Sequence, residues 1–327
     1  MPSWGVARAA ASATFQTSAR SAIVMERSSC RALWEKNANE QLPMASTTKI
    51  VTAITVIENA PDLEKVVEIP AAASGIEGSS IYLRAGEHLT IRELLLGLML
   101  RSGNDCAVAL ALEVGGTVEH FAEMMNQTAQ KLGCTGSNFT NPHGLPDDNH
   151  YTTARDLATI TCHALENSDF AEIVSTKSAK ISNEGYDYMR QLTNKNKLLN
   201  SYDGADGIKT GYTKKAGRCF VGSATRDGMQ VVVVVLNCGP MFEDTASLLD
   251  AAFHSYELRC IIPENKLCGA VYRNGQPTYY YCDNSFYYPL QVGEKTKTQV
   301  TVEDDCQKIE VTLDGQVIFS NNLTAVR

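Results

Sequence analysis

Ser46 and Lys49 are the first pair of residues in this sequence that could carry out covalent chemistry. In a helical turn, side chains three positions apart lie on the same side, so the Ser46 hydroxyl can contact the Lys49 amine. Serine becomes nucleophilic when a neighbour takes its proton, and lysine can do so once burial or another cation lowers its pKa. The apolar residues from 50 to 57 predict that burial, because a helix that is apolar on all sides lies inside a large core. Amide groups in the first turn of such a helix lack intrahelical partners and could hold an oxyanion.

Two further polar motifs lie near apolar segments. Ser102-Gly103-Asn104 separates two apolar helices, and a plain turn is its simplest interpretation, because these residue types are common in turns. Lys209-Thr210-Gly211 precedes a run of five valines, 231–235, which predicts a strand buried on both faces. We expect the Lys-Thr-Gly motif on an adjacent strand, where Gly211 lets a ligand approach the backbone closely, although a solvated lysine on an edge strand is the alternative. Each motif alone is weak, since about one Ser-x-x-Lys arises by chance in a chain of this length.

His143 lies in a loop between Pro142 and Gly144. Histidine is a common general base, so this residue is a candidate for the site. In such a loop, however, a histidine more often serves as a hydrogen-bonding brace. Both interpretations remain open from the sequence.

Composition excludes several classes of protein. The net charge of −8 and the scattered basic residues argue against a nucleic-acid partner. The most apolar segment, 94–114, is interrupted by polar residues and predicts a core element, not a membrane span. No C-x-x-C or Cys/His cluster occurs, so we predict neither a metal site nor a cofactor. The late cysteines permit one or two disulfides if the protein is exported: Cys260, Cys268, Cys282 and Cys306.

The order of apolar patterns predicts an α/β (α+β) fold with a central antiparallel sheet flanked by helices, an all-helical cluster and a small C-terminal β domain. Residues 1–19 are expected to be disordered or the remnant of an export segment, because small residues at 9–13 resemble a cleavage site but no intact signal peptide precedes them. We expect a main domain at 20–258 and an all-β domain at 261–327. The expected elements are a hairpin at 20–34, helices near 46–60, 90–101, 105–113, 117–132, 153–166 and 241–257, and strands at 217–224 and 229–237. The helix at 90–101 is expected to begin with a capping box formed by Thr90 and Glu93.

Together, the three motifs resemble the active-site triple of penicillin-recognising serine enzymes, in the same order and with Ser46, Ser102 and Lys209 separated by 56 and 107 residues. Longer matches are similar to the serine D-alanyl-D-alanine carboxypeptidases, the low-molecular-weight penicillin-binding proteins. They are Pro43–Lys49, Ser102–Asp105, Asn141–Leu145 and Asp206–Thr213. The resemblance covers about residues 20–258, and the β domain at 261–327 fits the family's second domain in position and character.

The resemblance implies a role for each matching residue. The implied catalytic residues are Ser46, Lys49, Ser102, Asn104 and Lys209, and the implied substrate-binding residues are Thr210, Gly211, Tyr212 and His143. Ser46 would attack the D-Ala-D-Ala carbonyl with neutral Lys49 as base, while Ser102 passes the proton to the leaving D-alanine. Asn104 would position Lys49, and Lys209 would help to keep it unprotonated. The Ser46 and Tyr212 amides would form the oxyanion hole, and Thr210 would bind the terminal carboxylate.

The resemblance also implies partners and a location. The expected substrate is the stem pentapeptide of peptidoglycan, and β-lactams are expected to acylate Ser46 and leave slowly. We therefore expect a bacterial protein that acts outside the cytoplasm. The family usually ends in an amphipathic membrane-anchoring helix, whereas this sequence ends in a β pattern, so membrane association is possible without a visible anchor. No Arg or Lys between Cys238 and Leu248 offers a second cation for the substrate carboxylate.

Three other functions use a similar set of residues. A class A β-lactamase needs a glutamate to activate the deacylating water, and no Glu occurs between Met124 and Leu165. A D,D-endopeptidase that cuts peptidoglycan cross-links shares the same catalytic residues and differs mainly in its groove. A non-catalytic wall-binding or penicillin-sensing module is the third, and the presence of every expected reactive group speaks against it.

Overall fold

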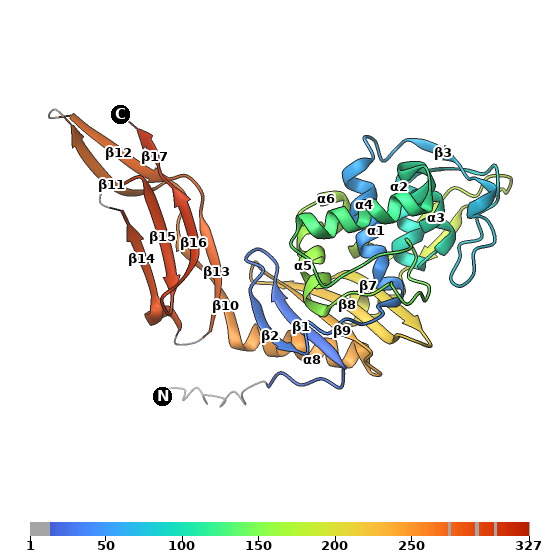
Figure 1. Cartoon of the computed structure of the whole chain (residues 1–327), viewed down its shortest axis with the longest axis horizontal. Coiled ribbons are helices and arrows are strands. Elements are labelled where there is room, and N and C mark those ends of the chain that lie inside the picture. Colours follow the sequence, from blue (N-terminus) through green and yellow to red (C-terminus); the bar gives the residue numbers. More distant parts are fainter. Residues whose placement is uncertain (1–13, 274–275, 292–293, 304–305, 327) are drawn as a thin grey trace, which may run out of the picture. The chain divides into compact units, whose positions relative to one another are not determined.

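The computed structural model of the chain describes residues 14–273, 276–291, 294–303 and 306–326. The chain divides into two compact units. The larger comprises Thr14–Arg226 and Gln230–Ala252, and the smaller comprises Asp227–Met229 and the residues from Phe253 onward (Figure 1). All three motifs lie in the larger unit.

A five-stranded antiparallel sheet forms the centre of the larger unit, with the strand order β2-β1-β9-β8-β7. Its strands are β1 (Ser21–Glu26), β2 (Ala32–Lys36), β7 (Ala205–Thr213), β8 (Gly217–Arg226) and β9 (Met229–Leu236). The valines of β9 are fully buried, as expected for a central strand covered on both faces. Strand β7 carries the Lys-Thr-Gly motif and forms one edge of the sheet, where Tyr212 pairs with Arg218 of β8.

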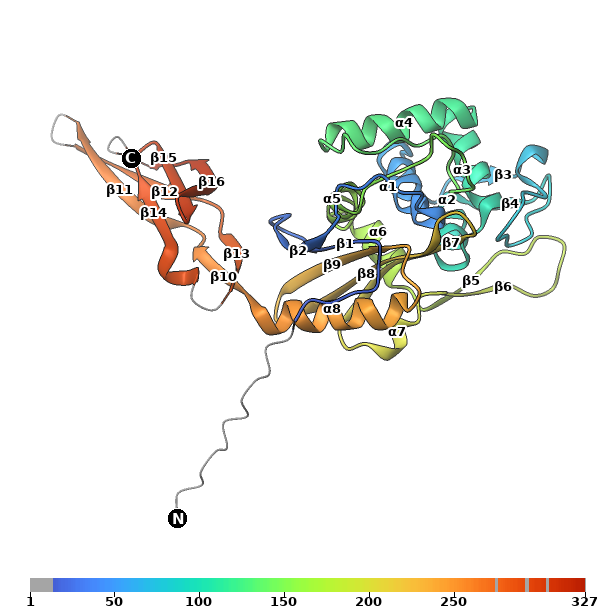
Figure 2. The same ribbon diagram turned by 60° about the horizontal axis from the view of Figure 1, so that its bottom comes forward.

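Helices cover both faces of this sheet (Figure 2). Helix α8 lies on one face, and α1 lies on the other among the remaining long helices. The helices are η1 (Ala45–Thr48), α1 (Lys49–Asn59), η2 (Ala71–Ala73), α2 (Ile91–Leu96), η3 (Gly97–Arg101), α3 (Asn104–Gly115), α4 (Val118–Lys131), α5 (Ala154–Ala164), α6 (Ser168–Ser175), α7 (Leu198–Ser201) and α8 (Met241–Ser255). Two small two-stranded antiparallel sheets complete the unit: β3 (Val66–Glu68) with β4 (His88–Thr90), and β5 (Ser178–Ile181) with β6 (Arg190–Thr193). The predicted central antiparallel sheet flanked by helices is confirmed.

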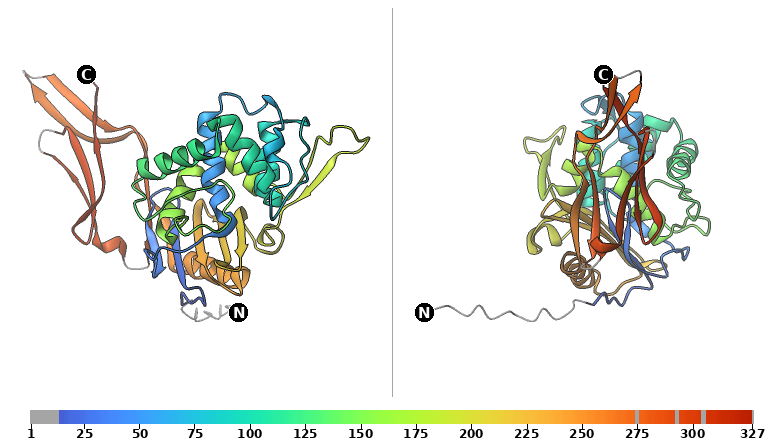
Figure 3. Two further views of the ribbon diagram at one scale, coloured as in Figure 1. Left: turned by 45° about the vertical axis from the view of Figure 1, so that its right-hand side comes forward. Right: turned by 90° about the vertical axis from the view of Figure 1, so that its left-hand side faces the viewer.

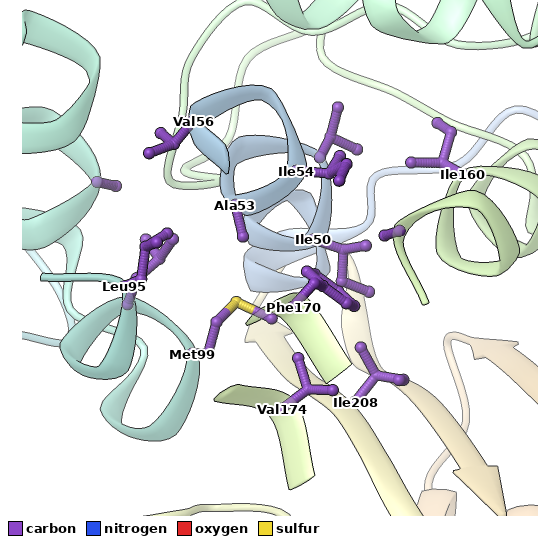
Figure 4. Close-up of a cluster of buried hydrophobic side chains, with 14 of the residues drawn as sticks. Ile50, Ala53, Ile54, Val56, Leu95, Met99, Ile160, Phe170, Val174 and Ile208 are labelled. Carbon is purple, nitrogen blue, oxygen red and sulfur yellow. The ribbon is translucent and has the colours of Figure 1, made fainter. Parts of the chain in front are cut away.

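Helix α1 forms the axis of the hydrophobic core (Figure 4). Ile50 and Ile54 point toward α5 and α6, where Phe170 is fully buried. On another side of α1, Leu95 and Met99 cover the helix from α2 and η3. A helix with apolar contacts on nearly every side stays fixed in the core, so the residues at its N-terminal end occupy a defined position.

Local details differ from the sequence-based expectations at three places. Ser46 lies in the 3₁₀ turn η1, and the α-helix starts only at Lys49; side chains three apart eclipse each other in a 3₁₀ turn, so the two still meet. The helix expected at 153–166 ends at Ala164, and the short helix α6 follows it unpredicted. By contrast, the predicted capping box of α2 is present, with reciprocal bonds between Thr90 and Glu93.

The smaller unit is built almost entirely of short antiparallel strands (Figure 3). They are β10 (Tyr256–Ile262), β11 (Lys266–Arg273), β12 (Gln276–Cys282), β13 (Phe286–Gln291), β14 (Thr298–Val302), β15 (Lys308–Leu313), β16 (Gln316–Asn322) and β17 (Thr324–Val326), with the short helix η4 (Glu294–Lys297). They form one two-stranded and two three-stranded sheets, β10-β13, β11-β12-β17 and β14-β15-β16. A small core that includes Ile262, Ile309 and Val311 lies inside this unit.

Cysteines and the N-terminal segment complete the description. Each of the ten cysteines lies among the described residues and is a free thiol, so the disulfides that the sequence left possible are not formed.

Of the segment 1–19, residues 1–13 lie outside the described residues, while Thr17 and Ser18 donate hydrogen bonds to Asp244. Among the described residues, no helix combines the length and the apolar character that crossing a membrane requires.

We expect Phe170→Ala to lower the free energy of unfolding by about 3–5 kcal/mol, because the fully buried ring leaves a cavity beside α1. Val66→Ala, at a position that is 57% exposed, serves as the control and should change stability by less than about 0.5 kcal/mol. Urea unfolding followed by circular dichroism measures both. Equal effects of the two substitutions would contradict the assigned core.

Candidate active site

The amine of Lys49 lies at the centre of the candidate site and has three hydrogen-bond partners. Its Nζ lies 2.7 Å from Asn104 Oδ1, 2.6 Å from the carbonyl oxygen of His143 and 3.1 Å from Ser46 Oγ. These partners come from η1, from the start of α3 and from the loop after α4. The folded chain therefore brings three segments that are far apart in sequence to one nitrogen.

The chemistry of the partners fixes the direction of the amine's lone pair. Asn104 Oδ1 and the His143 carbonyl oxygen can only accept, so each takes an N–H of Lys49. The Asn104 amide is oriented by donating its own N–H to the Glu77 carbonyl oxygen, 2.6 Å away. In neutral Lys49 the third position then holds the lone pair, which faces Ser46, the one partner with a proton to give. This is the arrangement that general-base activation of a serine requires.

Burial sets the protonation of both lysines. Lys49 is fully buried, and desolvation together with the positive charge of Lys195 lowers its pKa to about 7. Lys209 is 1% exposed, and burial together with the charges of Lys49 and Lys195 lowers its pKa well below the ordinary value. A solvated Lys209 on an edge strand, the alternative interpretation, is therefore excluded. Near neutral pH, a large fraction of Lys49 is the free amine that can accept a proton.

Glycine at two positions lets the backbone segments meet. A Cβ on Gly211 would lie 3.0 Å from the Ser46 amide nitrogen, so strand β7 runs directly beside the turn that carries the nucleophile. Gly144 has φ +84°, and a Cβ there would overlap the Ala45 carbonyl group. The His143 loop and the strand thus enclose η1 from two sides.

Two non-glycine residues of the site adopt left-handed backbone conformations. Ala45, directly before the nucleophile, has φ 50°, and Ser102 has φ 65° at the end of η3. Such conformations cost free energy and persist only where the surrounding fold imposes them, often at functional sites. They aim the Ser46 and Ser102 side chains at the same space.

A cavity of about 370 Å³ opens in front of Ser46. It is lined by Ser46, Ser79, Ser102, Lys195, Thr210, Gly211, Tyr212, Arg218, Met241 and Phe242. Hydroxyl groups, the β7 backbone and two cations therefore surround the nucleophile. A peptide with a terminal carboxylate has the matching chemistry.

His143 contributes its backbone rather than its ring. Its carbonyl oxygen accepts from Lys49, and its Nδ1 accepts from the Leu145 amide. Burial and the nearby Lys49 charge lower its pKa to about 3, so the ring is neutral at physiological pH. The bracing interpretation fits this geometry, and the general-base interpretation does not.

His150 is a second bracing histidine that the sequence did not reveal. Its Nδ1 accepts from the Thr140 amide, so its Nε2 carries the proton and donates to Thr48 Oγ1, 2.8 Å away. The Thr48 hydroxyl in turn donates to the Ala45 carbonyl oxygen. This chain of bonds ties the loop after α4 to η1.

Asp105 anchors the loop at 79–83, and sequence reasoning assigned it no role of its own. Its buried carboxylate accepts from the Ser80 hydroxyl and from the amides of Ile81 and Leu83. Because Asp105 follows Asn104 directly, it fixes the loop at 79–83 relative to the Lys49 partner.

The residues predicted from the sequence fall into three groups by position. Ser46, Lys49, Asn104 and the His143 backbone form one hydrogen-bonded cluster, and Lys209 is buried near it. The remaining residues line the cavity: Ser102, Thr210, Gly211 and Tyr212. Sequence reasoning missed Arg218 and Lys195, the two cations of the cavity. Arg218 could have been found from the alternation of side chains along β8, because it pairs with Tyr212 on the neighbouring strand.

The family model that describes D-alanyl-D-alanine carboxypeptidases, Peptidase_S11, matches residues 7–239. The chain belongs to this family. It is 35% identical over 261 residues to D-alanyl-D-alanine carboxypeptidase DacF of Bacillus subtilis, with 77% of this chain and 67% of DacF covered. DacB2 of Mycobacterium tuberculosis is also 35% identical, over 69% of this chain and 79% of that protein.

Solved structures of similar proteins agree with this membership. Penicillin-binding protein 5 from Haemophilus influenzae superimposes with a TM-score of 0.81 at 26% identity, covering 95% of this chain and 97% of that one. The Streptomyces K15 DD-transpeptidase gives a TM-score of 0.69 at 33% identity, over 73% of this chain and 98% of that one. The similarity to penicillin-binding protein 5 thus extends over nearly the whole chain, beyond the residues that the family model matches.

The rate of covalent reaction with a β-lactam should rise with pH around a midpoint near 7, because only deprotonated Lys49 can accept the Ser46 proton. In Lys195→Ala the midpoint should move to higher pH, because removal of the positive charge of Lys195 raises the pKa of Lys49. Stopped-flow acylation across pH 5–9 measures the profile.

Lys195→Arg is the matched control, because it keeps the charge and should keep the midpoint. A midpoint that is the same in Lys195→Ala and wild type would contradict the electrostatic coupling. A profile that falls with rising pH would contradict Lys49 as the base.

Proposed function

We propose that the protein is a serine D,D-carboxypeptidase that removes the terminal D-alanine from peptidoglycan stem pentapeptides through an acyl-enzyme on Ser46. The observation that carries the proposal is the Lys49 amine, whose two acceptor partners leave its lone pair directed at Ser46. Family membership supplies the reaction class, and the cavity in front of Ser46 has groups that fit a peptide ending in a carboxylate. β-Lactams are proposed to acylate the same serine.

Acylation begins when Lys49 accepts the Ser46 proton and Ser46 Oγ attacks the carbonyl carbon of the D-Ala-D-Ala bond. The Ser46 amide and the amide of Tyr212 on β7 are proposed to stabilise the oxyanion, supported by the contact between Gly211 and the Ser46 nitrogen. The C–N bond then breaks, and Ser102 is proposed to relay the proton to the leaving amine. Water hydrolyses the acyl-enzyme, which restores the Ser46 hydroxyl and releases the shortened peptide.

The substrate backbone is proposed to pair with the open edge of β7. An extended peptide can add to an exposed strand edge, which fixes the scissile bond along the strand. The terminal carboxylate would then lie near Thr210, with Arg218 on the neighbouring strand as the second cation. Arg218 donates to the Gly239 carbonyl oxygen at 3.0 Å, which orients its guanidinium at the rim of the cavity.

We also propose separate roles for the two parts of the chain and a cellular location for the protein. Catalysis is assigned to residues 20–258, because every candidate site residue lies in the larger unit, and 261–327 is proposed as a separate β domain outside the reaction. A substrate in the cell wall requires that the protein act outside the cytoplasm of a bacterium. Labelling of intact cells with a membrane-impermeant fluorescent penicillin tests this location.

Ser46→Ala should abolish the covalent adduct that penicillin forms, and mass spectrometry of the digested wild type should place that adduct on the peptide containing Ser46. Lys49→Ala should fold normally but lose at least about 10³-fold in acylation rate, because the base and its charge are both removed. Near wild-type acylation by Lys49→Ala would overturn the assignment of the base.

Arg218→Ala should raise the KM for a pentapeptide about tenfold and leave kcat nearly unchanged, because a charge-assisted hydrogen bond to the substrate carboxylate is lost. Arg218→Lys should restore part of the affinity. With a C-terminally amidated peptide, wild type and Arg218→Ala should bind equally well. An equal loss on both peptides would show that Arg218 does not recognise the carboxylate.

Carboxypeptidase and endopeptidase activities are separated by comparing a free pentapeptide stem with a cross-linked dimer of stems. We expect release of free D-alanine from the pentapeptide. Cleavage of the dimer alone would replace the proposed function by that of a D,D-endopeptidase.

A further inference from the structure

A second cavity, of about 540 Å³, lies outside the catalytic pocket and is lined by aromatic, basic and amide side chains. The lining includes Tyr82, Arg84, Asn183, Tyr186, Tyr188 and Gln191. They come from the loop before β4 and from the β5–β6 hairpin, which extends away from the central sheet (Figure 2). None of these residues has a role in the proposed reaction.

The tyrosines of this cavity are unusually open to solvent. Tyr82 is 83% exposed, Tyr186 is 53% exposed and Tyr188 is 60% exposed. Tyr82 also has φ 62°, a left-handed conformation that is unfavourable for a bulky residue. The amides on both sides of it, at Ile81 and Leu83, are held by the Asp105 carboxylate. The fold therefore maintains an unfavourable backbone conformation that leaves the Tyr82 ring exposed to solvent, which points to a function.

Contacts to a buried carboxylate anchor the segments that carry the aromatic surface. The Glu87 carboxylate is nearly inaccessible and accepts hydrogen bonds from the Arg190 guanidinium at 2.9 Å and from the Arg84 amide at 3.1 Å. The Arg84 guanidinium lies 4.6 Å from the centre of the Tyr186 ring. The rings of Tyr186 and Tyr188 lie 5.2 Å apart. A ligand here would meet a surface that is already formed.

The two cavities share the segments that build their walls. Ser79 and Lys195 line the catalytic pocket, and the Lys195 ammonium donates to the Ser79 hydroxyl at 2.9 Å. Three residues after Ser79, Tyr82 lines the second cavity, and four residues before Lys195, so does Gln191. At up to about 3.5 Å per extended residue, the lining residues of the two cavities on these segments are at most about 10–14 Å apart. One polymer can contact both.

We propose that the second cavity binds amino-sugar rings of the peptidoglycan glycan, an inference that rests on the proposed function for the identity of the polymer. The C–H faces of a pyranose ring pack on tyrosine rings, while the amides of Asn183 and Gln191 and the Arg84 guanidinium can bond to hydroxyl and acetamido oxygens. The volume fits a small ligand or a short stretch of sugar, within the usual range for pockets. A folded protein partner would need a much larger contact, about 800 Å² on each side.

The test uses the full chain and glycan strands from which an amidase has removed all stem peptides. Such strands contain no D-Ala-D-Ala, so they cannot bind as substrates. Wild type should co-sediment with them, and a Tyr186→Ala/Tyr188→Ala double variant should bind about tenfold more weakly. Tyr82→Asn should weaken binding in the same direction, since asparagine tolerates the left-handed backbone. Tyr272→Ala, at a 71% exposed tyrosine of the smaller unit, is the matched control and should bind like wild type.

Activity on a sugar-free pentapeptide and acylation by penicillin report on the fold and on the catalytic pocket. Both should stay within about twofold of wild type in all variants, whereas the KM for stems attached to glycan should rise in the cavity variants. Absence of glycan binding by wild type, or binding that the tyrosine substitutions leave unchanged, would overturn the proposal. Tyrosine-dependent binding to phosphatidylglycerol vesicles without glycan binding would overturn it in favour of a membrane surface. If wild type released no D-alanine but still bound glycan through these tyrosines, the proposed function would fail and the sugar site would stand.

Discussion

The rest of the site depends on a buried amine without a charged hydrogen-bond partner. Burying a charged group costs roughly several kcal/mol when no opposite charge compensates it. The partners of Lys49 are a serine hydroxyl, an amide oxygen and a backbone carbonyl, and none of them carries a charge. The pKa of Lys49 falls to about 7 as a result, so that near neutral pH a large fraction of it is a neutral amine, which is a base. The hydrophobic packing around α1 thus serves catalysis as well as stability, because it keeps water from the first turn of that helix.

Much of the fold around the site was predictable because short motifs and periodic patterns of apolar residues indicate it. The valine run fixed the central strand, the Thr90–Glu93 box fixed the start of α2, and both are present as expected. Ser46 and Lys49 were predictable as a pair because their contact depends only on local helical spacing. The convergence of three motifs followed from family resemblance and not from spacing, since no local rule links residues 46, 104 and 209.

What escaped prediction depends on tertiary contacts. Lys195 and Arg218 enter the cavity from an irregular segment and from β8, and neither stands in a recognisable motif. The bracing role of His150 depends on the position of Thr48, more than 100 residues earlier in the chain. The His143 ring suggested acid–base chemistry, yet in the folded chain the His143 carbonyl oxygen binds Lys49 and the ring only accepts a hydrogen bond from the Leu145 amide. Residue type therefore indicated a role only where the residue stood in a recognisable motif, and it did not reveal contacts that depend on the folded chain.

Strand β7 ends one side of the sheet, and its outer row of peptide groups is the proposed docking line for substrate. An open strand edge cannot distinguish a stem peptide from a strand of another protein molecule by hydrogen bonding alone. Immediately after β7 the chain turns through the exposed Lys214 and Lys215, and the Lys215 ammonium is paired with the Asp148 carboxylate. Two copies paired antiparallel along β7 would place these lysines at opposite ends of the shared edge, so their charge does not prevent such pairing. Only Thr210, Gly211 and Tyr212 of β7 line the cavity, whereas residues 207–209 are buried, so the edge has room for a short peptide and little for a full strand of a second protein molecule.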